Sequence, residues 1–173
     1  MKVLAKEDAS EVLGGKSPDT FVSELSNRLR QVGGTHSIPR DSGAKTALSR
    51  AFAYLLLRKS SVCVYVSGWG VWRSSENLDL FYGYRRSLGE SRPLIEAPVH
   101  MFECTEHDTF VSILSMVFYF VWDAWVFDIE GNELVRISHD EWLEVRVDDE
   151  EARREVATEL EKYGMPLLES ESR

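Results

Sequence analysis

The chain has little cysteine and no recognisable export signal. Only Cys63 and Cys104 occur among its 173 residues, and a domain of this size has no need of a disulfide. Acidic residues interrupt the apolar stretch at the N-terminus after a few positions, which argues against a secretory signal peptide. We therefore expect a protein of the reducing cytoplasm in which both thiols are small, buried hydrophobic groups.

The short motifs of the commoner enzyme and zinc-binding classes are also missing from the sequence. It contains no C-x-x-C, H-E-x-x-H, G-x-S-x-G or G-x-G-x-x-G. Two fragments, GGKS at residues 14–17 and GAKT at residues 43–46, imitate the end of a phosphate-binding loop, but neither has the earlier glycine or the preceding strand that such a loop needs. The sequence therefore predicts no nucleotide or organic cofactor.

Basic residues are outnumbered, and the imbalance is concentrated near the C-terminus. The formal net charge is -9, and residues 140–173 carry 12 acids against 5 bases. An acidic protein repels nucleic-acid backbones at long range, so a nucleic-acid partner is disfavoured. The alternative would need a local basic face, for which the candidates are the bases between Arg40 and Lys59.

A long hydrophobic stretch is present at residues 110–127, but it does not resemble a membrane span. It contains Asp123 and two serines and has no flanking basic residues. Its polar residues Ser112, Ser115 and Tyr119 recur at helical spacing, which is typical of a buried helix. We expect a central buried helix at residues 108–122, entered through a capping box from Thr105 to Asp108.

The fold class that these patterns predict is α+β, with a mostly antiparallel sheet of about four or five strands, the buried helix across one face and several other helices around it. Parallel pairing stays open for the earliest strand. We expect a loosely ordered leader at residues 1–17, one domain at residues 18–165 and a disordered tail at residues 166–173. Helices are expected at residues 19–32, 44–57, 75–88, 108–122 and 148–163, and strands at residues 61–72, 97–104, 124–129, 134–138 and 142–147.

The segment from Phe118 to Trp142 contains the best candidate for a functional site. If Gly131 and Asn132 form a two-residue hairpin loop, Asp123 faces Asp140 across the two strands. Two opposed carboxylates repel each other unless a proton, an arginine or a metal lies between them. His139 and Glu141 would lie close by. The candidate catalytic residues are therefore Asp123, His139, Asp140 and Glu141, and the candidate metal ligands are Asp123, His139 and Asp140.

Two simpler interpretations compete with a site. The sequence SHDE at residues 138–141 fits a capping box that turns the chain, so the cluster can be a structural corner and the aromatic residues around it a core. Cys104, Glu106, His107 and Asp108 form a second cluster at the start of the buried helix. A cysteine near a histidine and a helix N-terminus can act as a nucleophile, but these acids are also what a helix start needs.

Two functions of different kinds remain open from the sequence alone. The first is a non-catalytic, acidic cytoplasmic binding, adaptor or neutraliser-type protein that acts on a protein partner, possibly a basic one, through its C-terminal region. The second is a metal-dependent or acid/base hydrolase built on Asp123, His139, Asp140 and Glu141, with a divalent metal as its cofactor if it is metal-dependent. The sequence predicts no membrane partner and leaves homo-oligomerisation open.

Overall fold

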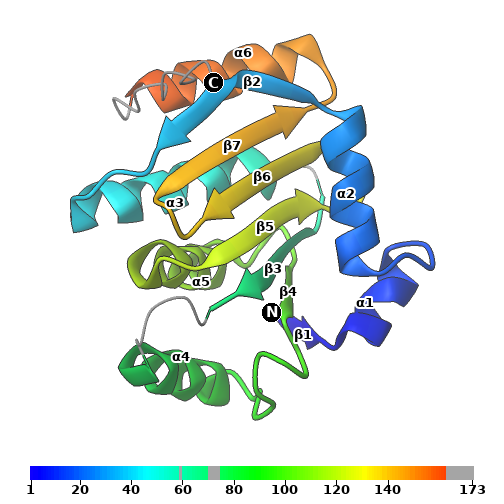
Figure 1. Ribbon diagram of the computed structural model, residues 1–173, viewed down its shortest axis with the longest axis vertical. Coiled ribbons are helices and arrows are strands. Elements are labelled where there is room, and N and C mark those ends of the chain that lie inside the picture. Colours follow the sequence, from blue (N-terminus) through cyan, green and yellow to red (C-terminus); the bar gives the residue numbers. More distant parts are fainter. Residues whose placement is uncertain (59, 70–74, 163–173) are drawn as a thin grey trace.

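The computed structural model describes residues 1–58, 60–69 and 75–162, with side chains in the fourth helix from Leu78 onward (Figure 1). It is an α+β protein whose strands form one seven-stranded sheet in the order β1-β4-β3-β5-β6-β7-β2. Every neighbouring pair in the sheet is antiparallel. The strands are β1 Lys2–Leu4, β2 Arg30–Ser37, β3 Val62–Gly68, β4 Val99–Phe102, β5 Asp123–Asp128, β6 Glu133–Ser138 and β7 Trp142–Val147. The helices are α1 Lys6–Val12, α2 Pro18–Arg28, α3 Ser42–Leu56, α4 Ser75–Ser87, α5 His107–Phe120 and α6 Glu150–Lys162.

The α+β class and the antiparallel sheet confirm the prediction, but the expected strand number was too low. Both additional strands come from the N-terminal part of the chain. Residues 30–37 were expected to end a helix and enter a loop, yet they form β2, whose pairing with β7 shifts register between Gln31 and Thr35, around Gly33 and Gly34. Glycines at a bulge keep a strand in the sheet while changing its register, and sequence reasoning took them for a helix stop.

Residues 1–17, expected to be a loosely ordered leader, contain β1 and α1. Leu4, Ala9 and Leu13 of this segment are almost completely buried. They pack in a small core with residues of α2 and with the face of the sheet that α1 and α2 cover. Three inward-pointing apolar side chains thus hold the N-terminal segment to the domain, while the expected tail at residues 166–173 lies outside the described residues.

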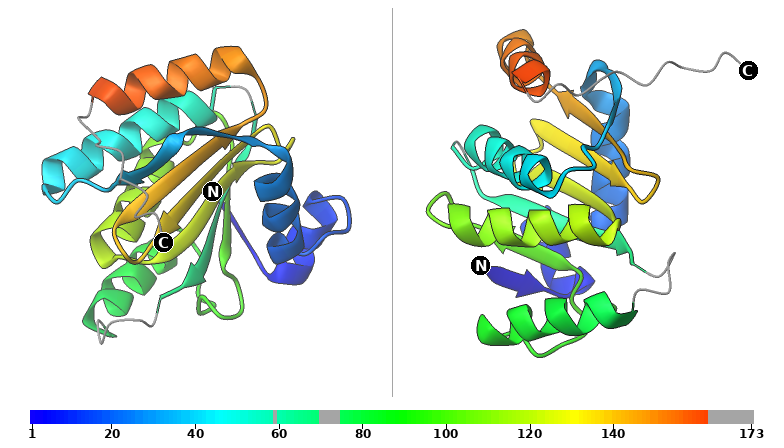
Figure 2. Two further views of the ribbon diagram at one scale, coloured as in Figure 1. Left: turned by 45° about the horizontal axis from the view of Figure 1, so that its top comes forward. Right: turned by 90° about the vertical axis from the view of Figure 1, so that its left-hand side faces the viewer.

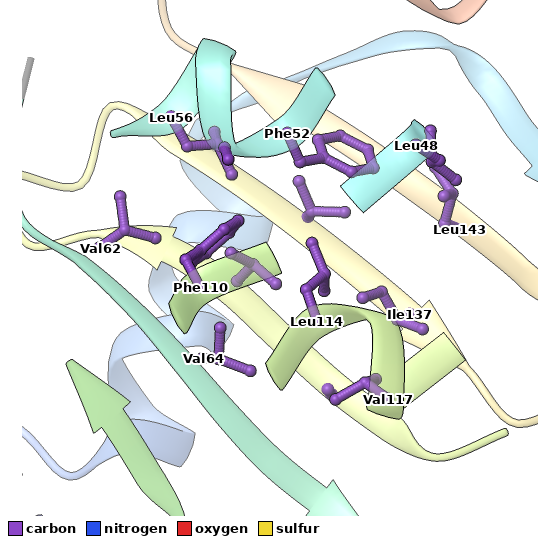
Figure 3. Packing of buried hydrophobic residues seen from close by; sticks show 14 of the residues in the cluster. Leu48, Phe52, Leu56, Val62, Val64, Phe110, Leu114, Val117, Ile137 and Leu143 are labelled. Atoms are coloured by element: carbon purple, nitrogen blue, oxygen red, sulfur yellow. The ribbon is translucent and has the colours of Figure 1, made fainter. Parts of the chain in front are cut away.

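The other face of the sheet carries the main core and is covered by α3, α4, α5 and α6 (Figure 2). α3 and α5 lie side by side, and their side chains meet those of the central strands in Figure 3. Asp41 caps α3 by accepting a hydrogen bond from the Ala44 backbone N–H at 2.9 Å. The central helix α5 is present as expected, but its N-cap is Glu106, whose side chain makes no capping bond. The predicted capping box from Thr105 is therefore wrong.

The polar positions of α5 form a seam against α3. The Ser115 hydroxyl donates to the Ser49 hydroxyl at 3.1 Å in the buried part of this contact. Near the exposed end, the Tyr119 hydroxyl lies 2.8 Å from the Thr46 hydroxyl. These paired hydroxyls explain the polar residues Ser115 and Tyr119, whereas the Ser112 hydroxyl donates to the Asp108 carbonyl of its own helix at 2.8 Å. Within the described part of the chain, no helix is both long enough and apolar enough to cross a membrane.

Candidate functional site

The hairpin between β5 and β6 has a different register from the one that its sequence suggests. Trp125 faces Arg136 and Phe127 faces Leu134. Each residue of β5 thus pairs with a residue of β6 that comes two positions earlier in the sequence than the predicted partner. The reason is a longer turn. Gly131, with a φ of 82°, donates its backbone N–H to the Asp128 carbonyl, and the Asp128 carboxylate accepts the Glu133 N–H at 2.8 Å. The predicted opposition of Asp123 and Asp140 is therefore wrong.

The corrected register places Asp123 beside His139. The Asp123 carboxylate accepts a hydrogen bond from the His139 backbone N–H at 3.0 Å, and the His139 Nδ1 atom lies 2.9 Å from Asp123 Oδ2. Because a carboxylate only accepts, Nδ1 carries the ring proton, and in the neutral ring Nε2 keeps its lone pair. Nε2 lies 3.5 Å from Asp140 Oδ1. Three of the four predicted residues are thus neighbours, with a histidine between the two acids.

Glu141, the fourth candidate, turns away from this group. Its backbone has a φ of 59°, and its side chain lies 3.6 Å from the Nζ atom of Lys45 on α3. Residues 139–141 form the tight turn between β6 and β7, closed by a hydrogen bond from the Glu141 N–H to the Ser138 carbonyl. The chain therefore turns sharply at this point, and Ser138 and Glu141 begin no helix.

A bulge in β3 makes room for the Asp123 carboxylate. Val66 pairs with Ala124 and Gly68 pairs with Asp123, which leaves Ser67 as the additional residue on β3. A Cβ atom on Gly68 would lie only 2.9 Å from Asp123 Oδ2. Glycine is therefore required for the close approach of β3 to this carboxylate, and the bulge leaves Ser67 exposed beside it.

Next to this group, an arginine packs between two tryptophans. The Arg136 guanidinium carbon lies 5.3 Å from the Trp125 ring centre and 4.9 Å from the Trp142 ring centre. Both distances are within the range of a cation–π interaction. Among the described residues, Arg136 makes neither an ion pair nor a hydrogen bond, so its N–H groups are available at the surface.

These residues line one surface hollow of about 270 Å³, at the end of the sheet face that α1 and α2 leave uncovered. In Figure 1, α2 crosses the ends of the strands near residue 128, and the other ends of β5, β6 and β7 have no helix in front of them. We call this region the open sheet face. It consists of Ser67, Asp123, Trp125, Arg136, Ser138, His139, Asp140 and Trp142.

Sequence reasoning treated the aromatic residues of this segment as core, which holds for only some of them. Trp122 and Phe127 are buried, whereas Trp125 and Trp142 are half exposed. Arg136 was not identified, because the predicted register paired it with Phe127 rather than with Trp125. Predicting the pair of Trp125 and Arg136 would have required a four-residue turn at residues 129–132, because that turn length places the two residues opposite each other.

The other sequence candidates do not assemble into sites. Cys104 is exposed, against expectation, and neither its side chain nor that of His107 makes a hydrogen bond among the described residues. Cys63 is buried, and burial raises the pKa of its thiol to about 12. Within the same described residues, no three His, Cys, Asp or Glu side chains are arranged to hold a metal ion.

Some charged residues of the two proposed binding regions make local contacts within the described part of the chain. Several acids of α6 are neutralised locally, as in the two-point pair of Arg58 with Glu155 and the contact of Arg153 with Glu150 at 3.3 Å. Lys45, from the predicted basic face, is buried and donates to the Phe118 carbonyl at 3.1 Å.

Family models, curated protein sequences and solved structures were all compared with this chain, and none of them matches it.

Proposed function

We propose that this chain is a non-catalytic binding protein that recognises a protein partner through the open sheet face. The observation that carries the proposal is the stack of Trp125, Arg136 and Trp142 on a part of the sheet without helix cover. Tryptophan and arginine are the residues most enriched among those that dominate the energy of protein interfaces. The net charge of -9 would speed association with a basic partner, so the acidic C-terminal region acts at long range rather than as the anchor.

The arrangement would also help this open surface hollow to bind a partner firmly. A guanidinium held between two rings has lost most of its rotational freedom before binding, so fixing it in an interface costs little further entropy. Its unused N–H groups can donate to carbonyl or carboxylate oxygens of a partner. On either side, the tryptophan rings present apolar surface whose hydration is unfavourable, so its burial against a partner would favour binding.

The test is affinity capture with the immobilised full chain, followed by a measured Kd for the partner that is recovered. Trp142→Ala should weaken binding at least tenfold. Tyr54→Ala removes an aromatic ring that is 61% exposed on α3, far from the open sheet face, and should leave the Kd unchanged. A partner that binds the Trp142→Ala protein as tightly as the wild type would disprove this function for the open sheet face.

A hydrolase with acid/base chemistry is the second candidate, and the contact of Asp123 with His139 favours it. Asp123 would act as a positioning residue that orients the ring, and His139 Nε2 would exchange a proton with a substrate in the hollow. The experiment is a screen of ester and phosphoester substrates with and without divalent metal ions. Turnover that disappears in His139→Gln and persists in Tyr54→Ala would support it, and equal turnover in both variants would assign the activity to a contaminant.

A further inference from the structure

A small acidic cavity lies at the other end of β5 from the open sheet face. Its volume is about 110 Å³, which is more than one water molecule needs. Asp123 at the start of β5 belongs to the open sheet face, whereas Asp128 at the end of the same strand lines this cavity. The other polar lining residues are Ser60, Asn132, Glu133, Asp148 and Asp149. Three segments distant in sequence thus bring four carboxylates and a serine hydroxyl to one hollow.

Backbone hydrogen bonds hold two walls of the cavity together. The Asp148 N–H donates to the Asn132 carbonyl at 2.9 Å, which ties the chain after β7 to the turn between β5 and β6. Across that turn, the Asp128 carboxylate accepts the Glu133 N–H at 2.8 Å. The positions of Asp128 and Asp148 are therefore fixed before any ligand enters, which lowers the entropic cost of binding.

Asp128 is a buried acid that would gain from a positive charge in the cavity. It is 3% exposed, and burial raises its pKa. Besides the Glu133 N–H, its carboxylate accepts a hydrogen bond from Asn132 Nδ2 at 3.3 Å. Neutral donors offset only part of the cost of burying a carboxylate, and two bonds leave some of its lone pairs unused. Asp128 therefore retains the capacity to accept hydrogen bonds from a cation.

Ser60 independently indicates that the cavity takes a hydrogen-bonding ligand. The residue is 8% exposed, and its hydroxyl has no hydrogen-bond partner. Buried hydroxyls are usually partnered, because leaving one without a partner is unfavourable. Asp148 is exposed, and among the described residues its carboxylate makes neither a hydrogen bond nor an ion pair. Three acceptors are thus available in one cavity, namely Ser60 Oγ and the carboxylates of Asp128 and Asp148.

We propose that this cavity binds a primary ammonium group, as carried by an aliphatic amine or by a lysine side chain. An ammonium has three N–H donors and no acceptor, which matches the three acceptors of Ser60, Asp128 and Asp148. The proposal does not depend on Glu133 and Asp149, which also line the cavity. A metal ion fits less well, because within the described residues no three His, Cys, Asp or Glu side chains are arranged to hold one. The three proposed ligands lie outside the open sheet face, so the two proposals can fail separately.

The probe is putrescine, an aliphatic diamine, compared with tetramethylammonium chloride at equal ionic strength and pH 7. Tetramethylammonium is positively charged but has no N–H to donate, so it controls for general attraction to an acidic protein. At a putrescine concentration about 100 times its Kd, the wild-type melting temperature should rise by about 5 °C above this control. The absence of a putrescine-specific rise would overturn the proposal.

Asp148→Asn tests the site by calorimetric titration with putrescine, and Asp79→Asn is its matched control. Both variants remove one negative charge, but Asp79 is an exposed residue of α4 and does not line the cavity. Asp148→Asn should raise the Kd by about tenfold or more, because it removes a charged acceptor, and Asp79→Asn should leave it unchanged. The same Kd in Asp148→Asn and the wild type, or an equal increase in Asp79→Asn, would overturn the proposal.

Ser60→Ala separates hydrogen bonding from charge, since it leaves the net charge unchanged. It should fold, because it removes a hydroxyl that has no partner, and it should raise the Kd for putrescine by about fivefold. An unchanged Kd would contradict the role of Ser60 as a ligand.

A second titration distinguishes the two sources of the ammonium group. The ligands are putrescine and a capped tripeptide with one central lysine. Tighter binding of putrescine would support a free amine as the natural ligand, and tighter binding of the peptide would support a lysine side chain of a protein partner. Binding of neither ligand would overturn the proposal.

Discussion

The two faces of the sheet are built from the same strands but differ in how completely helices cover them. On the main-core face, β5 contributes Ala124 and Val126, both almost fully buried beneath the α3 and α5 layer. On the opposite face, the same strand contributes Phe127, which is fully buried under α2, and Trp125, which lies beyond the cover of α2 and is half exposed. The alternation of side chains along a strand therefore does not decide burial alone. On this face, burial also depends on how far α2 extends over the strand.

This difference separates stability from recognition. The covered face buries apolar area, which is the main contribution to the free energy of folding. The open sheet face retains large side chains that give less to folding and remain available to a partner. Substitutions of similar size on the two faces should therefore have very different effects on stability, and the comparison can be tested directly.

The largest expected effect is on the covered face. Phe110 of α5 is fully buried and packs edge-on against Phe102, with 5.3 Å between the ring centres. Phe110→Ala should lower the free energy of unfolding by about 3–5 kcal/mol, because it removes apolar contacts and leaves a cavity. Urea denaturation measures the loss. A cost below 1 kcal/mol would mean that the core is not packed as described.

The second prediction uses the pH dependence of stability to test the burial of His100. The pKa of His100 is about 3 in the folded protein, below the ordinary value of 6.5, so the unfolded chain binds more protons between these two values. Stability should therefore be full well above pH 6.5 and fall as the pH drops, by about 1.6 kcal/mol between pH 6.5 and pH 5. Urea midpoints at the two pH values measure it. His100→Gln should reduce this dependence, and an unchanged slope in that variant would contradict the assignment.

A smaller effect is expected at the bulge that supports the open sheet face. Gly68→Ala should cost about 1–2 kcal/mol, because the new methyl group meets the Asp123 carboxylate at 2.9 Å and must displace it from His139. The matched control is Gly83→Ala on α4, where an added Cβ meets nothing within 4 Å and should stabilise the helix by up to about 1 kcal/mol. In thermal melts, the melting temperature should fall in the Gly68→Ala protein and rise in the Gly83→Ala protein. The NMR signal of the His139 ring should also shift in the Gly68→Ala protein.

The smallest change in stability should follow from Trp142→Ala on the open sheet face. Trp142 is partly exposed and contacts the Arg136 guanidinium, so the loss should be about 1 kcal/mol, well below that of Phe110→Ala. The measurement is the same urea titration used for Phe110→Ala. A loss as large as that of Phe110→Ala would show that this face is a folding core rather than a recognition surface.

Helix and strand types were largely predictable from the sequence where the periodicity was strong. α3, α5, α6 and the strands from β3 to β7 follow from apolar spacing, from acids at helix starts and from alternation in β7. β1 and β2 were missed because one is three residues long and the other contains two consecutive glycines. Short or bulged edge strands depend on a partner strand rather than on local preference, so their own residues say little about them.

Three of the four candidate residues lie together in the structure, but the predicted strand pairing was wrong. Asp123, His139 and Asp140 do lie together, yet the pairing that suggested them assumed a two-residue loop. The loop length depends on the Asp128 carboxylate, which binds the backbone across the turn, and this contact leaves no periodic signal. The shift of two residues kept each side chain on its face and exchanged its neighbour, which is why Arg136 between two tryptophans was not foreseen.

The order of strands has a consequence for how the chain reaches its native state. β1 and β2 lie at opposite edges of the sheet, although they are close together in the sequence, and they pair with β4 and β7. During synthesis, β1 can pair with β4 only after Phe102 has emerged, and β2 can pair with β7 only after Val147 has emerged. Until then, the growing sheet presents unpaired strand edges, which are the regions most prone to intermolecular association.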